Sequence, residues 1–209
     1  WKTGAGWAFG SWRDFNQPRR PAPSPAAKPV ECGAPERLEP TLAVTLKPSQ
    51  IASQLAKGIA PIYVVAGEDP LLIQETLDTI RAAARKAGYA EREVLDVERG
   101  FNWQRVVGAC ASMSLFATQR IVELRMSAGP DEEGRKTLQA LAAKPAPDTL
   151  LLVVCGELDK RARESAWFKA CDAAGVTVYA WPVKTEEFRP WLDTRLRAAG
   201  VAIDADAVK

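Results

Sequence analysis

Between residues 44 and 184, short apolar runs typical of strands alternate with longer segments whose apolar residues have helical spacing. Continuous apolar runs typical of buried strands occur at 61–66, 92–98, 120–126, 148–155 and 176–181. Apolar residues at helical spacing predict helices near 49–58, 69–87, 102–110, 131–144 and 162–174. This alternation predicts an α/β fold with a mostly parallel five-stranded sheet between helices. The run 148–155 is apolar on both faces, so we expect it to be the central strand.

The two ends of the chain have different patterns. Residues 1–43 are rich in Trp, Gly and Pro without any period, which predicts a disordered or extended tail. The first residue is not Met, so two readings stay open: a native tail, or a misassigned start with Val44 as the candidate beginning. After Pro182, a helix opening at Pro190 predicts the start of a second, helical domain over 185–209 that is cut off. The α/β domain would then be 44–184.

The stretch 111–119 places large apolar residues where the preceding helix would expose them. Asn102 is a suitable N-cap, and the helical wheel gives one buried side. If the helix continues, Leu115 and Phe116 fall roughly 120–140° from the centre of that side, and Met113 lies at its edge. Exposed neighbouring anchors of this kind indicate a partner's pocket, and the alternative is a second core layer. The expected buried side comprises Trp103, Val106, Val107, Cys110 and Ser114.

Composition is that of a globular protein without membrane or secretion signals. Hydrophobic residues make up 47% and charged residues 26% of the 209 positions. No apolar run approaches the ~18 residues of a membrane helix, and the N-terminus lacks a signal peptide. The four cysteines, at 32, 110, 155 and 171, include no CxxC pair. We therefore expect reduced thiols in a cytoplasmic protein that does not contact a membrane.

The inventory of charged residues excludes several chemistries. The chain has no histidine, which excludes His-based triads, His metal sites and His general bases. Residues 1–48 carry 7 basic and 4 acidic residues, a net +3, while 49–209 carry 21 basic and 22 acidic residues, a net −1. The expected folded part thus has no global basic excess, which argues against a dedicated nucleic-acid-binding domain but leaves a local patch open.

The loop after the first long strand lacks the features that bind phosphate. A P-loop requires Gly-x4-Gly-Lys-Ser/Thr, whereas this loop, 67–73, reads GEDPLLI. Pro70 removes an amide donor, and Glu68 and Asp69 place carboxylates where phosphate oxygens would lie, which repels a polyanion. Glu123 stands alone on its strand without a preceding Asp, so no acidic pair is expected to hold a metal. The sequence predicts no cofactor, no metal and no ATP binding tighter than the millimolar range.

Other charged clusters suit helix termini. The acidic groups at 131–133 and 186–187 are typical of helix starts. The basic group 160–163 reads as a solvated helix start, and the alternative is contact with a neighbouring subunit or a nucleic-acid backbone. No set of residues converges on a catalytic site, so we expect no intrinsic enzymatic activity.

Several of these stretches carry a family resemblance. The chain over about 44–209 resembles the delta subunit of bacterial DNA polymerase III, a clamp-loader subunit. The residues that carry the resemblance are YVVAGEDPLLIQE at 63–75, MSLFA at 113–117, LLLVV at 150–154, LDK at 158–160 and AWF at 166–168. The first two are fairly specific when they occur in this order.

The resemblance implies a fold and a role. The fold would be an AAA+-like, P-loop-type domain with a degenerate nucleotide site, followed by a small helical domain, with the collar domain absent. Leu115 and Phe116, assisted by Met113, would grip the sliding clamp (beta subunit) and open its ring for loading during replication. Implied partners are the clamp, the other clamp-loader subunits and, indirectly or weakly through the complex, primed DNA. Polymerase catalysis would lie in another subunit of the holoenzyme. Two rival hypotheses remain, a nucleotide-dependent α/β enzyme and a scaffold of the same fold with another partner.

Overall fold

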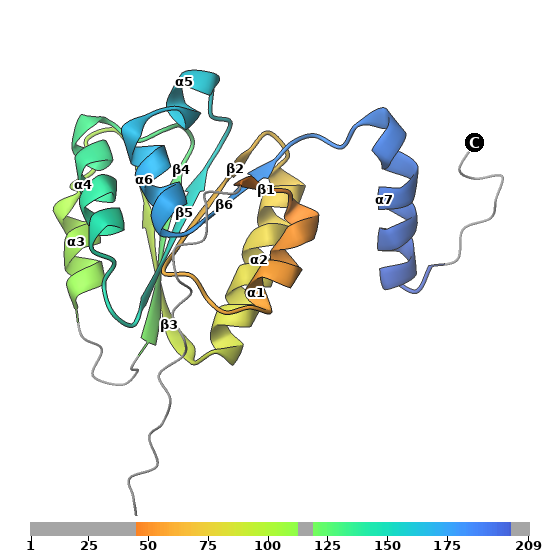
Figure 1. The fold of residues 1–209 in the computed structure, drawn as a ribbon, viewed down its shortest axis with the longest axis horizontal. Helices are drawn as coiled ribbons and strands as arrows, with labels where there is room; N and C mark the ends of the chain where they lie inside the picture. Colours follow the sequence, from red (N-terminus) through yellow and green to blue (C-terminus); the bar gives the residue numbers. More distant parts are fainter. Residues whose placement is uncertain (1–44, 113–118, 202–209) are drawn as a thin grey trace, which may run out of the picture. The chain divides into compact units, whose positions relative to one another are not determined.

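One parallel sheet organises the α/β part of the molecule (Figure 1). The computed structural model describes residues 45–112 and 119–201. Within these residues the sheet has six strands in the order β1-β6-β2-β5-β4-β3, and every pairing is parallel. The strands are β1 (Thr45–Leu46), β2 (Ile62–Gly67), β3 (Tyr89–Asp96), β4 (Gln119–Met126), β5 (Thr149–Cys155) and β6 (Val176–Ala180).

Helices cover both faces of the sheet, each over its own apolar cluster (Figure 1). On one face, Trp103, Leu138 and Trp167 are fully buried against the strands. On the other face, Leu77 and Ile80 of the long helix α2 pack in a second cluster. Helices α3 (Gln104–Ala111), α4 (Glu132–Ala143), α5 (Lys160–Arg163) and α6 (Ala166–Ala174) belong to the first face, and η1 (Pro48–Gln50), α1 (Ile51–Leu55) and α2 (Pro70–Lys86) to the second. The expected α/β fold with a parallel sheet between helices is confirmed.

Local sequence signals explain most element boundaries. Asp69 caps α2 by accepting hydrogen bonds from Leu71 N and Leu72 N, and Pro70 occupies the first helical position. Asp131 caps α4 in the same way through Gly134 N. The predicted central strand, β5, lies between β2 and β4 with nearly all its residues buried. These elements follow the prediction because cap, periodicity and length agree.

The strands differ from the prediction at two places. The sheet has a sixth strand, β1, which pairs with β6 at Thr45–Thr177 and Leu46–Val178. Two residues are too short to display a strand period, so only pairing defines this strand. Strand β3 begins at Tyr89 instead of Arg92, because pairing with β4 starts there and shifts register between Tyr89 and Glu91.

Three helices also differ. The helix expected over 162–174 is divided into α5 and α6, because Ser165 has extended backbone angles and becomes the N-cap of α6. Helix α7 spans Thr185–Ala198, so Pro190 lies inside it and does not open it. The buried side of α3 includes Ala109, whereas Val107, which was expected there, is 38% exposed. Trp103, Val106 and Cys110 are buried as expected, so the buried side is only rotated towards Ala109, a short residue that carries little weight in a hydrophobic pattern.

Candidate functional site

The predicted contact residues belong to the connection between α3 and β4. Met113, Leu115 and Phe116 lie outside the described residues, so their predicted role stays a prediction. The helical-wheel argument for them required α3 to continue, but α3 ends at Ala111 and Ser112 has an extended ψ of 126°. That part of the reasoning is wrong. Parallel strands with helical crossovers place the end of α3 and the start of β4 at the amino-terminal edge of the sheet.

Side chains from two strands, β4 and β5, contact the last turn of α3 at this edge. Arg120 at the start of β4 donates from Nη1 to the Ala109 carbonyl at 3.3 Å, and its Nη2 lies 3.3 Å from Glu91 Oε2 of β3. Thr149 Oγ1 of β5 lies 3.5 Å from the Cys110 carbonyl and 3.4 Å from the Pro147 carbonyl, which share its one hydroxyl proton. These contacts reach carbonyls in the last turn of α3, the part of a helix whose carbonyls generally need partners from outside it. The helix end that precedes 113–118 is therefore fixed to the sheet.

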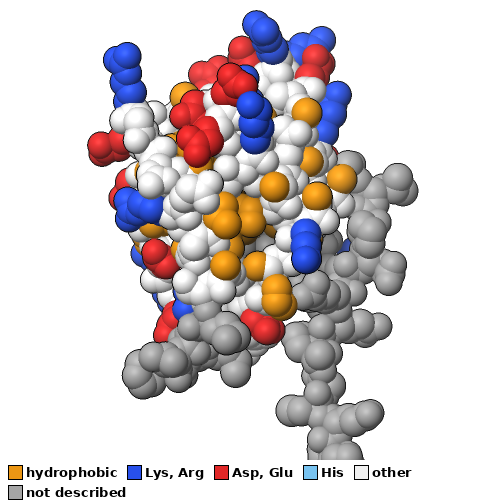
Figure 2. Space-filling view, turned by 90° about the vertical axis from the view of Figure 1, so that its left-hand side faces the viewer, with side chains coloured by type: hydrophobic (Ala, Val, Ile, Leu, Met, Phe, Trp, Pro, Cys, Tyr) orange, Lys and Arg blue, Asp and Glu red, His pale blue; other side chains and the backbone are white. Residues whose placement is uncertain are grey.

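The solvent face of α3 is unusually free of large polar side chains at its C-terminal half. Val107, Gly108 and Ala111 are all exposed there. The face of the molecule that carries α3 and α4 has hydrophobic side chains gathered in its middle, with most charged groups above them (Figure 2). An apolar surface next to the 113–118 connection is compatible with a protein contact on this side.

At the opposite edge of the sheet, the backbone N–H groups of the loop after β2, which a bound phosphate would require, already donate hydrogen bonds within the protein. Glu68 N donates to the Ala180 carbonyl at 3.1 Å, and Gly67 N donates to the Gly156 carbonyl at 3.3 Å. Leu71 N and Leu72 N donate to Asp69 Oδ1 at 2.9 and 3.2 Å, and Pro70 has no N–H. The carboxylate that caps α2 thus takes the place of a phosphate at the helix N-terminus.

Gly67 fits this closed loop because of its backbone and its neighbour. Its φ of +154° is a conformation that residues with a Cβ rarely adopt, and a Cβ there would overlap the Ala180 carbonyl oxygen. Strand β6 therefore packs directly against the loop. The sequence predicted a degenerate phosphate loop from residue types, and the hydrogen bonds give a structural reason for it.

Glu123 is the centre of a charged network that the sequence did not predict. Its side chain is fully buried in β4, and Arg81 of α2 binds both carboxylate oxygens, at 2.7 and 3.1 Å. Arg125 Nε lies 2.8 Å from Oε1, Arg92 Nε lies 3.7 Å from Oε2, and Asp78 binds the far side of Arg81 at 2.8 Å. Burial raises the pKa of Glu123, but hydrogen bonds and charge from Arg81 and Arg125 outweigh it, and the net pKa is lowered from its ordinary value of 4.5.

The network makes Glu123 a structural group. Both of its oxygens accept hydrogen bonds from arginines, whose positive charge opposes a metal ion at this position. In the described ranges 45–112 and 119–201, no cluster of three or more His, Cys, Asp or Glu could hold a metal ion. The sequence does contain one indication of this network, a single Glu in an apolar strand, because a buried carboxylate needs a cationic partner. It does not indicate which arginine is that partner.

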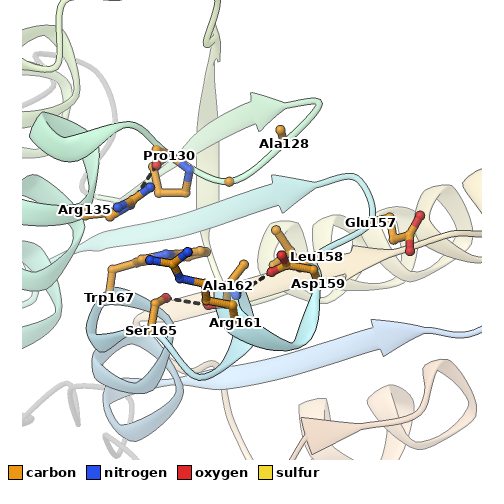
Figure 3. Close-up of a pocket in the computed structure, with 11 residues that line it drawn as sticks. Ala128, Pro130, Arg135, Glu157, Leu158, Asp159, Arg161, Ala162, Ser165 and Trp167 are labelled. Atoms are coloured by element: carbon orange, nitrogen blue, oxygen red, sulfur yellow. Dashed lines mark hydrogen bonds between the residues drawn. The ribbon is translucent and has the colours of Figure 1, made fainter.

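A cavity of about 560 Å³, lined by both polar and apolar groups, opens at the carboxyl ends of β4 and β5 (Figure 3). Its polar groups mostly hold the surrounding loops: Arg135 Nε donates to the Pro130 carbonyl at 3.1 Å, and Asp159 accepts from Ala162 N at 2.6 Å. Ser165 Oγ donates to the Ala162 carbonyl. No nucleophile paired with a base occurs among the residues around this cavity, which include Glu157, Leu158, Arg161 and Trp167.

The basic group 160–163 lies beside this cavity. It forms α5 with Asp159 as N-cap, and Lys160 is largely exposed and pairs weakly with Glu164 at 3.8 Å. This is the solvated helix start that the sequence favoured. Contact with a neighbouring subunit or a nucleic-acid backbone stays a prediction.

The described cysteines are core residues. Cys110, Cys155 and Cys171 are all buried and free. Burial raises the pKa of Cys110 to about 11 and the pKa values of Cys155 and Cys171 to about 12. They are therefore protonated thiols at neutral pH. Among the helices of the described chain, none is both long and apolar enough to span a membrane.

Together, the parallel sheet with helices on both faces and the loop after β2, whose amides are already bonded, define a doubly covered α/β domain. Comparison with known sequences is more specific, since the model of the family "DNA polymerase III, delta subunit" matches residues 63–180. The chain belongs to this family.

Individual relatives agree with the family. The chain is 28% identical over 165 residues to the DNA polymerase III subunit delta of Haemophilus influenzae, covering 78% of this chain and 48% of that protein. It is 29% identical over 162 residues to the Escherichia coli subunit, covering 77% and 47%. The chain thus spans about half the length of the curated relatives it matches. The solved Bacillus subtilis DNA clamp loader delta protein has a similar fold, with a TM-score of 0.57 at 17% identity over 77% of this chain and 50% of that one.

Proposed function

We propose that this chain is the clamp-binding part of a clamp-loader delta subunit, which opens the ring of the sliding clamp for loading onto primed DNA during replication. The observation that carries the proposal is the family match over 63–180. That range includes both the 113–118 connection and the closed loop at Gly67. A similarly folded protein is a DNA clamp loader delta protein, which agrees with this role.

The proposed contact is the pair Leu115–Phe116, with Met113 assisting. Burying two such side chains in an apolar pocket of the clamp would contribute roughly 3–6 kcal/mol before the cost of ordering. The pair follows closely on the end of α3, whose last turn is contacted by Arg120 and Thr149 of the sheet.

The proposed mechanism uses binding energy and no chemistry in this chain. Contact with Leu115 and Phe116 can open the clamp only if the open ring is bound more tightly than the closed one. The carboxylates and occupied amides at 67–72 argue that this subunit does not itself hydrolyse ATP. ATP-binding neighbours in the loader would control access to the clamp, and polymerase catalysis would belong to another subunit.

A pull-down of this chain with the sliding clamp (beta subunit), without ATP, tests the proposal. Binding at nucleotide-free conditions is the expected result, since the contact needs no phosphate. A chain that folds normally by circular dichroism and yet retains no clamp would contradict the proposal. That result would favour the scaffold hypothesis, in which the same fold serves another partner.

A further inference from the structure

The cavity of about 560 Å³ at the carboxyl ends of β4 and β5 is not used by the proposed function. Leu158 and Trp167 form part of its lining and are 2% and 1% exposed, so this part of the lining is apolar and firmly packed. Its charged lining residues are Arg135, Glu157, Asp159 and Arg161. A cavity with an apolar lining and a few charged groups has the composition of a ligand site.

The indole of Trp167 brings an unpaired donor to this cavity. Its Nε1–H donates to no residue within 45–112 or 119–201. Trp103 Nε1 is also unpaired, but it is enclosed by the core, whereas Trp167 Nε1 is not enclosed and Trp167 lines the cavity. A largely buried N–H without a protein acceptor costs free energy unless an oxygen from outside the fold accepts its proton. This indole therefore favours a ligand with an acceptor oxygen.

Two guanidinium groups add positive charge to the same lining. Arg135 Nε donates to the Pro130 carbonyl at 3.1 Å, and within the described residues its two terminal nitrogens have no hydrogen bond. Arg161 is exposed, and it forms neither a hydrogen bond nor an ion pair with any residue that the structure describes. The planar fork of N–H groups on an arginine matches the two oxygens of a carboxylate. The free donors of the cavity thus suit an anion.

The acidic residues of the lining indicate which anion fits. Asp159 already accepts a hydrogen bond from Ala162 N at 2.6 Å, and Glu157 lies at the opposite end of the cavity from Arg135 and Trp167 (Figure 3). Two carboxylates against two guanidinium groups leave the lining without net charge, so a nucleic-acid backbone or a polyphosphate gains no attraction along its length. A single carboxylate at the arginine end keeps its distance from Glu157.

We propose that this cavity binds an acidic peptide segment of a partner protein. One Asp or Glu carboxylate of the segment would accept from Arg135, Arg161 and the Trp167 indole N–H, and an apolar neighbour would pack on Leu158. This site goes beyond the proposed function and does not rest on the 113–118 connection. It gives a specific form to the contact with a neighbouring subunit that the basic group of α5 left open.

Nuclear magnetic resonance of the full, ¹⁵N-labelled chain observes the Trp167 indole N–H directly, and Trp167→Phe identifies its signal. The probes are two capped peptides, acetyl-Leu-Glu-Leu-amide and acetyl-Leu-Gln-Leu-amide. We expect the glutamate peptide to shift the indole signal saturably and the glutamine peptide to bind at least tenfold more weakly, because charge-assisted hydrogen bonds are lost. Arg161→Gln should weaken binding of the glutamate peptide about tenfold. Arg85→Gln, an exposed arginine of α2 on the other face of the sheet, is the matched control and should change nothing.

Inorganic phosphate and an oligothymidylate test the other sources of an anion. Tighter binding of either probe than of the glutamate peptide would overturn the proposal, the oligothymidylate result in favour of a nucleic-acid backbone. An unshifted Trp167 indole signal, equal binding of the two peptides, or unchanged affinity in Arg161→Gln would also overturn it. Arg161 has no contact within the described fold, so the folding of this variant is not at risk.

Discussion

Glu123 illustrates how a single buried charge is made acceptable. A carboxylate inside a sheet loses its hydration, and several kilocalories per mole oppose its burial. Arg81, bidentate and itself buried, and Arg125 and Arg92, half-exposed, surround it with positive charge. The network joins α2, β3 and β4, so it links the helical layer to the strands beneath it.

We predict that Glu123→Gln destabilises the protein at pH 7 by about 3 kcal/mol, because it leaves the buried Arg81 charge with only the exposed Asp78 carboxylate as a charged partner. The pKa of Glu123 is lowered in the folded state. Its contribution is therefore complete above the ordinary pKa of about 4.5 and is lost as the pH falls through the folded value. Urea unfolding should show a large difference in the free energy of unfolding between the variant and the unchanged chain at pH 7. The difference should be smaller at pH 3.

A surface carboxylate provides the control for this prediction. Glu132 pairs with Lys136 at 2.7 Å, but both side chains are exposed, so Glu132→Gln should have little effect at either pH. Equal stability loss from Glu123→Gln and Glu132→Gln at pH 7 would contradict the role given to the buried network.

The three buried thiols allow a test of burial. In a chain carrying Cys32→Ser, we expect slow alkylation of Cys110, Cys155 and Cys171 by iodoacetamide at pH 8 in the folded state and rapid alkylation in denaturant. The raised thiol pKa values, about 11 to 12, leave little thiolate, and burial blocks access. Mass spectrometry gives the number of labelled sites. Fast labelling of Cys155 or Cys171 in the folded chain would disprove their core placement.

At the scale of the element, α3 has an exposed glycine that the fold itself does not require. A Cβ at Gly108 would meet no atom within 4 Å. Glycine inside a helix is less favourable than alanine by roughly 0.5–1 kcal/mol. Gly108→Ala should therefore raise the free energy of unfolding by about that amount, measured by urea unfolding. A decrease would mean that Gly108 has a packing role within the fold.

Gly67 provides the opposite case. Gly67→Ala should destabilise the chain, because a Cβ there overlaps the Ala180 carbonyl and the φ of +154° is unfavourable. Similar effects from both glycine substitutions would contradict the distinction drawn between the two positions.

The elements that sequence reasoning predicted well have several agreeing signals. Helix α2 has a cap, a proline at its first position and a regular apolar face, and β5 is apolar throughout. The errors occur where a signal is local and tertiary contact decides. Proline is common at the first position of a helix, which is why Pro190 was expected to open α7. The helix instead begins five residues earlier, at Thr185. Two-residue β1 exists only through its pairing with β6.

The features of the candidate site also divide into those that adjacent residues predict and those that depend on tertiary contacts. The degenerate loop at 67–73 could be predicted because phosphate binding depends on residues adjacent in sequence. The arginines around Glu123 could not, because Arg81 is 42 positions away and comes from another element. Leu115 and Phe116 were singled out by a helical wheel that the end of α3 at Ala111 does not support, so the family resemblance carries that prediction.

At the scale of the whole α/β domain, the two edges of the sheet differ in the groups that they leave available for binding. At the carboxyl edge, Asp69 and the carbonyls of Gly156 and Ala180 occupy the amides that would bind phosphate. At the amino-terminal edge, Arg120 and Thr149 fix the helix end that leads to the proposed contact pair. A carboxyl edge whose loop amides are occupied, opposite an edge that holds the end of α3, agrees with the proposed role of binding a partner.

The closed carboxyl edge predicts a negative binding result. We expect calorimetry with ATP and Mg²⁺ to give no saturable binding in the micromolar range, because the loop supplies carboxylates where a P-loop supplies Lys and free amides. Micromolar binding would contradict this account of the loop and support the rival hypothesis of a nucleotide-dependent enzyme.

The central claim is that Leu115 and Phe116 bind the sliding clamp. Surface plasmon resonance with immobilised clamp should be performed on Leu115→Ala with Phe116→Ala, and on a matched control, Leu71→Ala with Phe188→Ala. The control removes a leucine and a phenylalanine that are 49% and 47% exposed elsewhere on the molecule. We predict loss of clamp binding for the first variant, unchanged binding for the second and unchanged folding of both. Retained binding by a folded Leu115→Ala, Phe116→Ala chain, or equal loss in both variants, would contradict the claim.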